Sequence, residues 1–144
     1  MTEIRAAGDF KLATAEIIGS TGTKVNITSN IVHINFFENI NSNAITGEIG
    51  IQDSAGFVSE LPIIGQEYLR LKLQTPSLRN ELDVIDFTEN VFIINTVQGR
   101  SEVGNSVSVY VLGFTSSEII KNQRTKVNGS VSGTYSDIVH QMLD

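Results

Sequence analysis

The chain of 144 residues fits a single domain, and its 40% hydrophobic and 18% charged residues are typical of a folded protein rather than a disordered one. A formal net charge of −6 argues against a protein that wraps nucleic acid, because neutralisation of phosphates dominates the affinity of such proteins. The absence of cysteine excludes disulfides, thiolate metal ligands and cysteine nucleophiles. No window approaches the roughly 18 apolar residues of a membrane helix, so no membrane partner is expected.

Short segments in which apolar and polar residues alternate predict β-strands along most of the chain. In chain order these strands are expected at residues 10–18, 25–27, 31–37, 45–52, 67–74, 91–97 and 106–114. Glycine-rich or polar residues between them predict turns at 19–24 and 53–56 and a hairpin loop at 98–105. The polar and acidic residues 76–90 predict a long loop.

The same alternation assigns side chains to the two faces of each strand. In the strand at 31–37, Val32, Ile34 and Phe36 are expected to share one face. In the strand at 106–114, the three valines are expected to share a face.

Helix signals are few and lie near the C-terminus. Ser116-Ser117-Glu118 predicts one capped helical turn, and Ser136-Asp137 predicts the start of a second short helix. Because this second helix starts just before the sequence stops, the chain is expected to be a fragment of a longer protein. The sequence thus predicts a mainly β domain over residues 1–115, an antiparallel barrel or sandwich of about six to seven strands. One or two short helices and a linker are expected over residues 116–144.

No set of residues has the spacing of a catalytic or metal site. The two histidines, His33 and His140, lie far from any second ligand in the sequence, and no serine sits in a Gly-x-Ser-x-Gly elbow. The densest acidic run, Glu81 to Glu89, lacks the spacing and the glycine of a calcium-binding loop, and such runs are usually solvated. We therefore expect no enzyme activity, no metal and no cofactor.

Four segments together resemble the N-terminal, tube-forming domain of baseplate hub proteins from contractile-tailed, T4-like marine bacteriophages. They are IRAAGDFKL (4–12), NITSNIVHINFFENINSNAITGEIGIQDS (26–54), LPIIGQEYLRLKLQTP (61–76) and FTSSEIIKNQRTKVNGSVSGTYSDIVHQML (114–143). No single motif is diagnostic of that family. The order and the spacing of all four segments carry the resemblance.

The resemblance implies a structural virion protein, a baseplate hub subunit in the ring that joins the tail tube to the central spike. In that family two barrels per chain form a pseudo-sixfold ring in a trimer, whereas this sequence matches only the first barrel. The implied partners are further copies of the chain, in a trimeric or pseudo-sixfold ring, and other baseplate, tube and spike proteins. The implied location is the tail baseplate of the virion, assembled in the host cytoplasm.

An apolar segment stands where a polar connection would be usual, just before the strand at 67–74. A ring subunit must bury apolar surface against its neighbour, so this segment is expected to lie in the subunit interface. Its residues are Leu61, Pro62, Ile63, Ile64 and Gly65. The alternative is that Ile63 and Ile64 plug the open end of the barrel itself.

The acidic balance of the chain also suits a tube. An acidic lumen repels the phosphates of DNA, so DNA is expected to pass through the lumen without specific binding. Glu48 and Gln52, on the polar face of the strand at 45–52, are the expected lumen-facing residues.

Two other classes of function stay open. The first alternative is a carbohydrate- or receptor-binding β-sandwich of a phage tail, although that class typically exposes aromatic platforms and this chain is 7% aromatic with no tryptophan. The second is a cell-wall hydrolase, carried by a further part of the protein beyond this chain.

Overall fold

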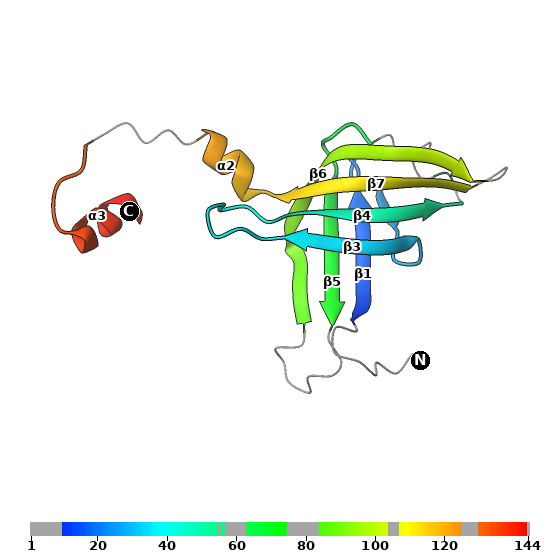
Figure 1. Ribbon diagram of the computed structural model, residues 1–144, viewed down its shortest axis with the longest axis horizontal. Coiled ribbons are helices and arrows are strands. Elements are labelled where there is room, and N and C mark those ends of the chain that lie inside the picture. Colours follow the sequence, from blue (N-terminus) through cyan, green and yellow to red (C-terminus); the bar gives the residue numbers. More distant parts are fainter. Residues whose placement is uncertain are drawn as a thin grey trace.

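The part of the chain that the computed structural model describes is mainly β, with one antiparallel sheet of seven strands and two short helices (Figure 1). The structure describes residues 10–54, 56, 63–74, 84–103, 107–124 and 130–143. The elements are β1 (Lys11–Ile18), β2 (Lys24–Asn26), β3 (Ile31–Phe37), β4 (Thr46–Asp53), β5 (Tyr68–Gln74), β6 (Val84–Val103), β7 (Val107–Ser116), α2 (Glu118–Arg124) and α3 (Tyr135–Leu143). The mainly β class, the antiparallel pairing, the strand number and the short helices are confirmed.

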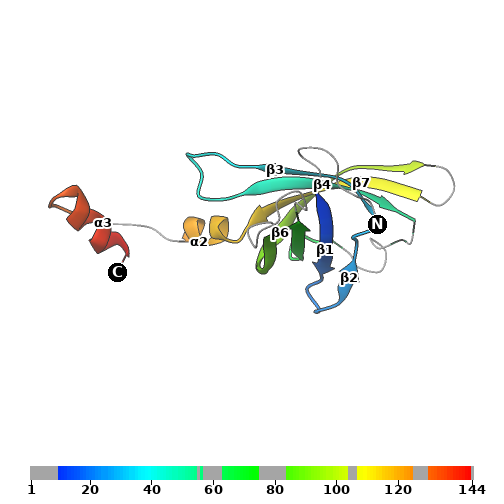
Figure 2. The ribbon, with the colours of Figure 1, turned by 90° about the horizontal axis from the view of Figure 1, so that it is seen from below.

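Strand β6 organises the sheet because it belongs to two layers. The strand order is β2-β1-β5-β6-β7-β4-β3. The first part of β6 pairs with β5, the second part pairs with β7, and Phe92 and Ile93 pair with both. Leu69 of β5 pairs with Phe92 of β6, whereas Leu71, two residues further along β5, pairs with Phe87. This irregularity in the register bends β6. As a result, β1 and β5 run across the direction of β3, β4 and β7 (Figures 1 and 2).

The sheet is not closed into a barrel, so of the two expected forms, barrel or sandwich, the barrel is excluded. Its edge strands β2 and β3 do not pair with each other, although they are consecutive in the sequence. The corner between them is tied to inner strands: Ile27 N donates to Ala15 O at 2.9 Å, and Gln52 N donates to Asn30 O at 2.8 Å. Because residues 27–30 bond to β1 and β4 in this way, the chain passes from one layer to the other and β2 and β3 form no ladder with each other.

The two layers enclose a single apolar core. An aromatic cluster lies where they meet, with the Phe92 ring centroid 4.6 Å from that of Phe87 and 4.8 Å from that of Phe114. Phe36 of β3 joins the cluster, 5.5 Å from Phe114. The buried core residues are Ala15, Ile17, Ile27, Ile49, Ile51, Leu69, Leu71, Leu73, Phe92, Ile94, Tyr110, Leu112 and Phe114. Burial of each large apolar side chain contributes roughly 1.5–3 kcal/mol, and both layers supply such side chains.

The predicted faces are confirmed except at the start of β3. Ile34 packs against the core and Phe36 joins the aromatic cluster, but Val32 is 64% exposed. The pairing register of β3 shifts between Ile31 and His33, and this bulge turns Val32 outward. The valines of β7 do share a face, the half-buried one that points away from the core.

Strand β6 is longer than predicted, and two loop predictions are wrong for it. Residues 84–90 are strand rather than part of a long loop, and residues 98–103 are strand rather than hairpin loop. All residues from Asn95 to Val103 are exposed, and they pair only with β7. Their polar composition therefore reflects contact with solvent and not a turn.

Helix α2 follows β7 directly, whereas α3 stands away from the sheet (Figures 1 and 2). The N-cap of α3 is Thr134, because its Oγ1 accepts a hydrogen bond from Asp137 N at 3.4 Å. Asp137 Oδ2 in return accepts from Thr134 N at 3.2 Å. This reciprocal arrangement is a capping box, so the predicted start at Ser136-Asp137 lies inside the first turn of the helix.

Gly47 of β4 occupies a position where only glycine fits. A Cβ atom there would collide with the Phe114 ring and with the backbone oxygen of Asn35. We expect Gly47→Ala to lower the free energy of unfolding by about 1–3 kcal/mol, the usual cost of overpacking, as measured by urea denaturation. Gln52→Ala, at an exposed position of the same strand, should change it by less than about 0.5 kcal/mol. Equal effects of the two changes would contradict the close packing at Gly47.

An ion pair on the outer side of the sheet links β5 to β6. Lys72 Nζ lies 2.8 Å from Asp86 Oδ2, and Thr88 Oγ1 donates to Asp86 Oδ1 at 2.6 Å. The hydrogen bond from Lys72, followed by those from Thr88, lowers the pKa of Asp86 from 3.8 to about 2. Of the acidic run, Asp86 and Glu89 thus lie in a strand, and the rest lies outside the described residues.

This shift in pKa predicts a pH dependence of stability. Because the pKa of Asp86 is lower in the folded state, its stabilising contribution is present above pH 3.8 and is lost as the pH falls through about 2. The parent protein should unfold at higher urea concentration than Asp86→Asn at pH 7, and the difference should shrink between pH 4 and pH 2. A difference that stays constant down to pH 2 would contradict the assignment.

Candidate functional site

The turn before β5 is organised by a buried carboxylate, that of Glu67, which is 1% exposed. Its Oε1 accepts a hydrogen bond from Ile64 N at 3.0 Å. Its Oε2 accepts from Gly65 N at 2.9 Å and from Gln66 N at 3.1 Å. The backbone oxygen of Glu67 accepts from Ile94 N of β6 at 2.9 Å. Hydrogen bonds to a carboxylate are stronger than neutral ones, so this turn is fixed firmly at the bend of β6.

The predicted interface segment divides into two parts. Ile63 packs against the core, whereas Ile64 is 65% exposed. Gly65 has φ +89°, a left-handed backbone angle that favours glycine. Leu61 and Pro62 lie outside the described residues. Ile63 thus belongs to the core, and because the sheet is not closed there is no barrel end for it to plug. Ile64 is exposed, and its place in a subunit interface stays a prediction.

The predicted lumen-facing residues lie together on the side of β4 that faces away from the core. Glu48 Oε1 accepts a hydrogen bond from Asn35 Nδ2 of β3 at 2.9 Å, and the side chain of Gln52 is exposed. Between them the His33 ring lies across Gly50, the residue with which it pairs. These side chains form one polar strip, and its place in a lumen stays a prediction.

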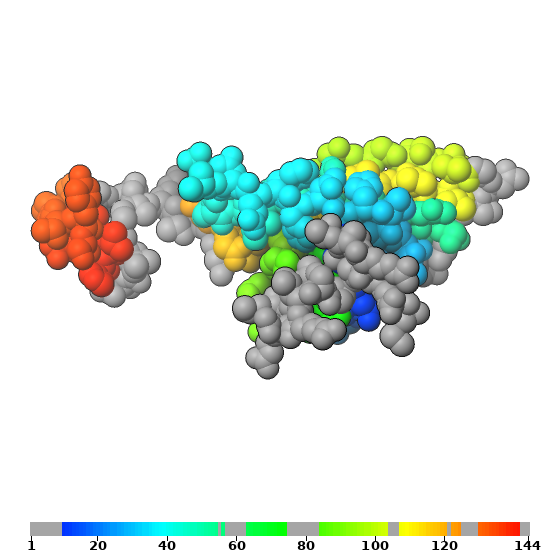
Figure 3. All heavy atoms as spheres, turned by 60° about the horizontal axis from the view of Figure 1, so that its bottom comes forward, coloured from blue at the N-terminus to red at the C-terminus, as the bar shows by residue number. Residues whose placement is uncertain are grey.

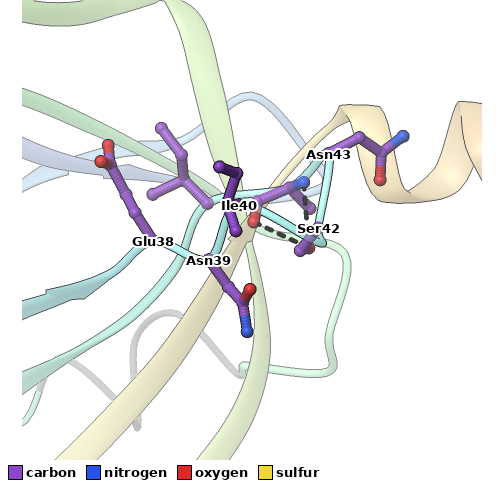
Figure 4. Close-up of a pocket in the computed structure, with 7 residues that line it drawn as sticks. Glu38, Asn39, Ile40, Ser42 and Asn43 are labelled. Atoms are coloured by element: carbon purple, nitrogen blue, oxygen red, sulfur yellow. Dashed lines mark hydrogen bonds between the residues drawn. The ribbon is translucent and has the colours of Figure 1, made fainter.

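A protruding feature of the molecule is the tip of the β3–β4 hairpin, which we define as residues 38–45 and call the hairpin tip (Figure 3). Its Ile40 is fully exposed, at 101%. The loop is held by local hydrogen bonds: Ser42 N donates to Asn39 O at 2.9 Å, and Ala44 N donates to Ser42 Oγ at 3.2 Å. The hairpin tip lines a hollow of about 520 Å³. Figure 4 shows the side chains that line it.

A second hollow, of about 320 Å³, lies between the turn before β5 and helix α2, and we call it the outer hollow. It is lined by Ser20, Gly65, Gln66, Tyr68, Ile93 and Ile120. Tyr68 and Ile93 pair directly across β5 and β6, with their side chains on the side away from the core. The outer hollow thus combines apolar walls from three elements with a rim that Glu67 holds in place.

Two residues that shape these features are not singled out by the sequence analysis. By its sequence Glu67 is only the first residue of the strand predicted at 67–74, and Ile40 stands between the strands predicted at 31–37 and 45–52. The available signals were a lone acidic residue that follows an apolar loop and a lone isoleucine among asparagines and serine. Neither signal identifies a role without the fold.

No three His, Asp or Glu side chains among the described residues are placed to hold a metal ion. Of the two histidines, His33 lies on the polar strip and His140 is exposed on α3. Neither α2 nor α3 has the length and the apolar character needed to cross a bilayer.

The role of Glu67 predicts the effect of an isosteric change. Glu67→Gln keeps the shape but places an NH₂ group opposite backbone N–H donors, so we expect a loss of about 1.5–3 kcal/mol in the free energy of unfolding. Gln66→Ala, beside it but with an exposed side chain, is the matched control and should change little. Urea denaturation of both variants tests this, and an unchanged Glu67→Gln variant would contradict the structural role of the carboxylate.

Comparison of the chain with models of protein families, with curated proteins and with solved structures found no match.

Proposed function

We propose that the chain is a structural subunit of a phage tail, a baseplate hub component that assembles with copies of itself into the ring between the tail tube and the central spike. The resemblance of four sequence segments to hub proteins supports this kind of assembly. The structural observation that carries the proposal is the unprotected edge of the sheet at β3.

Other free edges of the described sheet are blunted by charge. Strand β2 has three residues and includes Lys24. The first part of β6 carries Asp86 and Glu89, and its second part carries Arg100 and Glu102. Short or charged edges are the usual means by which a sheet avoids pairing with other chains.

Strand β3 lacks this protection. Its seven residues, Ile31–Phe37, include no charged residue and no proline. Val32 is 64% exposed and Phe37 is 54% exposed. A long, uncharged edge is a liability for a protein that stays monomeric and is well suited to a contact with another chain. In an assembly, the neighbouring subunit covers such an edge.

The polar strip on β4 is consistent with a wall that does not bind DNA. Glu48 and Gln52 lie on this strip, away from the core, and the whole chain carries a net charge of −6. An acidic wall repels phosphate, so transit of DNA through a lumen would not be slowed by adhesion. The proposal therefore includes no specific nucleic-acid contact.

Light scattering across a concentration series tests the proposal. We expect the mass to approach that of a trimer or a hexamer and then to stay constant, because a closed ring has a fixed number of subunits. Electron microscopy of the same sample should show a central opening. A mass that stays at one chain at every concentration, or that grows without limit, would contradict ring formation.

A pair of matched variants tests the part played by the β3 edge. Phe37→Lys adds a charge at the exposed edge, and Val139→Lys adds the same charge on α3 at a residue with the same exposure of 54%. We expect Phe37→Lys to weaken assembly about tenfold or more and Val139→Lys to leave it unchanged. Equal assembly of both variants would remove β3 from the contact.

A further inference from the structure

We propose that the hairpin tip of one copy inserts Ile40 into the outer hollow of a second copy, with Glu38 placed against Arg124. This contact deepens the ring proposal and rests on it for the identity of the occupant, a second copy of this chain. It assigns a surface to each side of the subunit interface.

The apolar parts of the two surfaces match in size and character. Ile40 is fully exposed at the apex of the hairpin, and the outer hollow measures about 320 Å³. A cavity of ~150 Å³ already holds a benzene-sized group, so the outer hollow admits an isoleucine side chain. Tyr68 and Ile120, which form two of its walls, are 44% and 37% exposed and gain burial when Ile40 enters.

The charges beside these apolar parts also match. Glu38 precedes Ile40 in the hairpin tip and lines the loop with it. Arg124 follows Ile120 by four residues in α2, so both lie on the same face of that helix. The side chains of Glu38 and Arg124 are both exposed. Neither takes part in the ion pair between Lys72 and Asp86. Opposite charges beside a matched apolar contact favour a second copy over an unrelated partner and fix its orientation.

The contact forms between copies rather than within one. In its own copy Ile40 is fully exposed, so the hairpin tip does not fill the outer hollow of the same chain. The two surfaces are different patches, and the contact is head to tail when each copy uses them on two different neighbours, as the ring proposal requires. Repeated head-to-tail contacts close into a ring when the rotation between copies permits it, and otherwise they extend as an open chain.

Hydrogen bonds within one copy already hold both surfaces in place. Hydrogen bonds within residues 38–45 hold the hairpin tip, and the Glu67 carboxylate holds the backbone at Gly65 and Gln66 on the rim of the outer hollow. Less conformational entropy is lost when two rigid surfaces dock. Strand β3 leads directly into the hairpin tip, so this contact also brings the uncharged edge of the sheet towards the neighbouring copy.

Disulfide trapping tests the contact directly, because the chain contains no cysteine of its own. Ile40→Cys and Ile120→Cys variants, mixed and exposed to air oxidation, should form a linked pair of chains, since their Cα atoms come within the ~7 Å that a disulfide requires. The yield should be about tenfold higher than for either variant alone or for Gln98→Cys mixed with Ile120→Cys. Gln98 is an exposed residue of β6 outside both surfaces. A yield equal to that of the controls would overturn the proposal.

A mixing experiment without cysteines tests the head-to-tail arrangement. Ile40→Asp removes the apolar side chain of the hairpin tip and leaves the outer hollow unchanged. Ile120→Asp places a charge in the outer hollow and leaves the hairpin tip unchanged. Each variant alone should stay monomeric in light scattering, and an equimolar mixture should form a complex of two chains that does not grow. Because both residues are exposed, circular dichroism should show the parent fold in both variants. Failure of the mixture to associate, while the parent protein does, would overturn the proposal.

A charge exchange separates this contact from a purely apolar one. Glu38→Arg and Arg124→Glu should each weaken association, and the double variant should restore it. A closed ring that survives Ile40→Asp would overturn the contact and leave the ring proposal standing. Conversely, trapping of Ile40→Cys with Ile120→Cys in open chains would support the contact and contradict the ring.

Discussion

The continuity of β6 through its bend is the constraint on which the rest of the structure depends. Phe92 and Ile93 are paired on one side with β5 and on the other with β7, so one strand joins two layers that run in different directions. The aromatic side chains of Phe87, Phe92 and Phe114 pack at this junction. Because the layers share both backbone hydrogen bonds and core contacts there, the sheet folds onto itself without closing into a barrel.

Regular local alternation made much of this fold predictable. In β5, Leu69, Leu71 and Leu73 are all buried, as the period of two requires. The length of β6 was not predictable in the same way, because its two parts find partners on opposite sides and its second part is exposed throughout. The bulge at the start of β3 and the open edges also depend on pairing between distant segments. Such pairing leaves no local pattern in the sequence.

The candidate surfaces, too, could be predicted only where a local sequence pattern reveals them. The apolar character of residues 61–65 is visible in the sequence, but the split between a packed Ile63 and an exposed Ile64 follows from the fold. Glu67 is buried because three backbone N–H groups converge on it, and only the turn creates that convergence. The outer hollow draws its walls from β5, β6 and α2, which are separated in the sequence. No spacing rule for a single segment finds a surface of this kind.

The position of β7 has a mechanical consequence. This strand lies between β4 and β6, and it continues through Ser117 directly into α2. A tensile force applied to the C-terminal segment would therefore act along β7 and load two ladders of hydrogen bonds in shear. Shear breaks many bonds at once, whereas a strand at an edge, such as β2, is peeled one bond at a time. A pull on the helical segment would therefore meet the centre of the sheet rather than its edge.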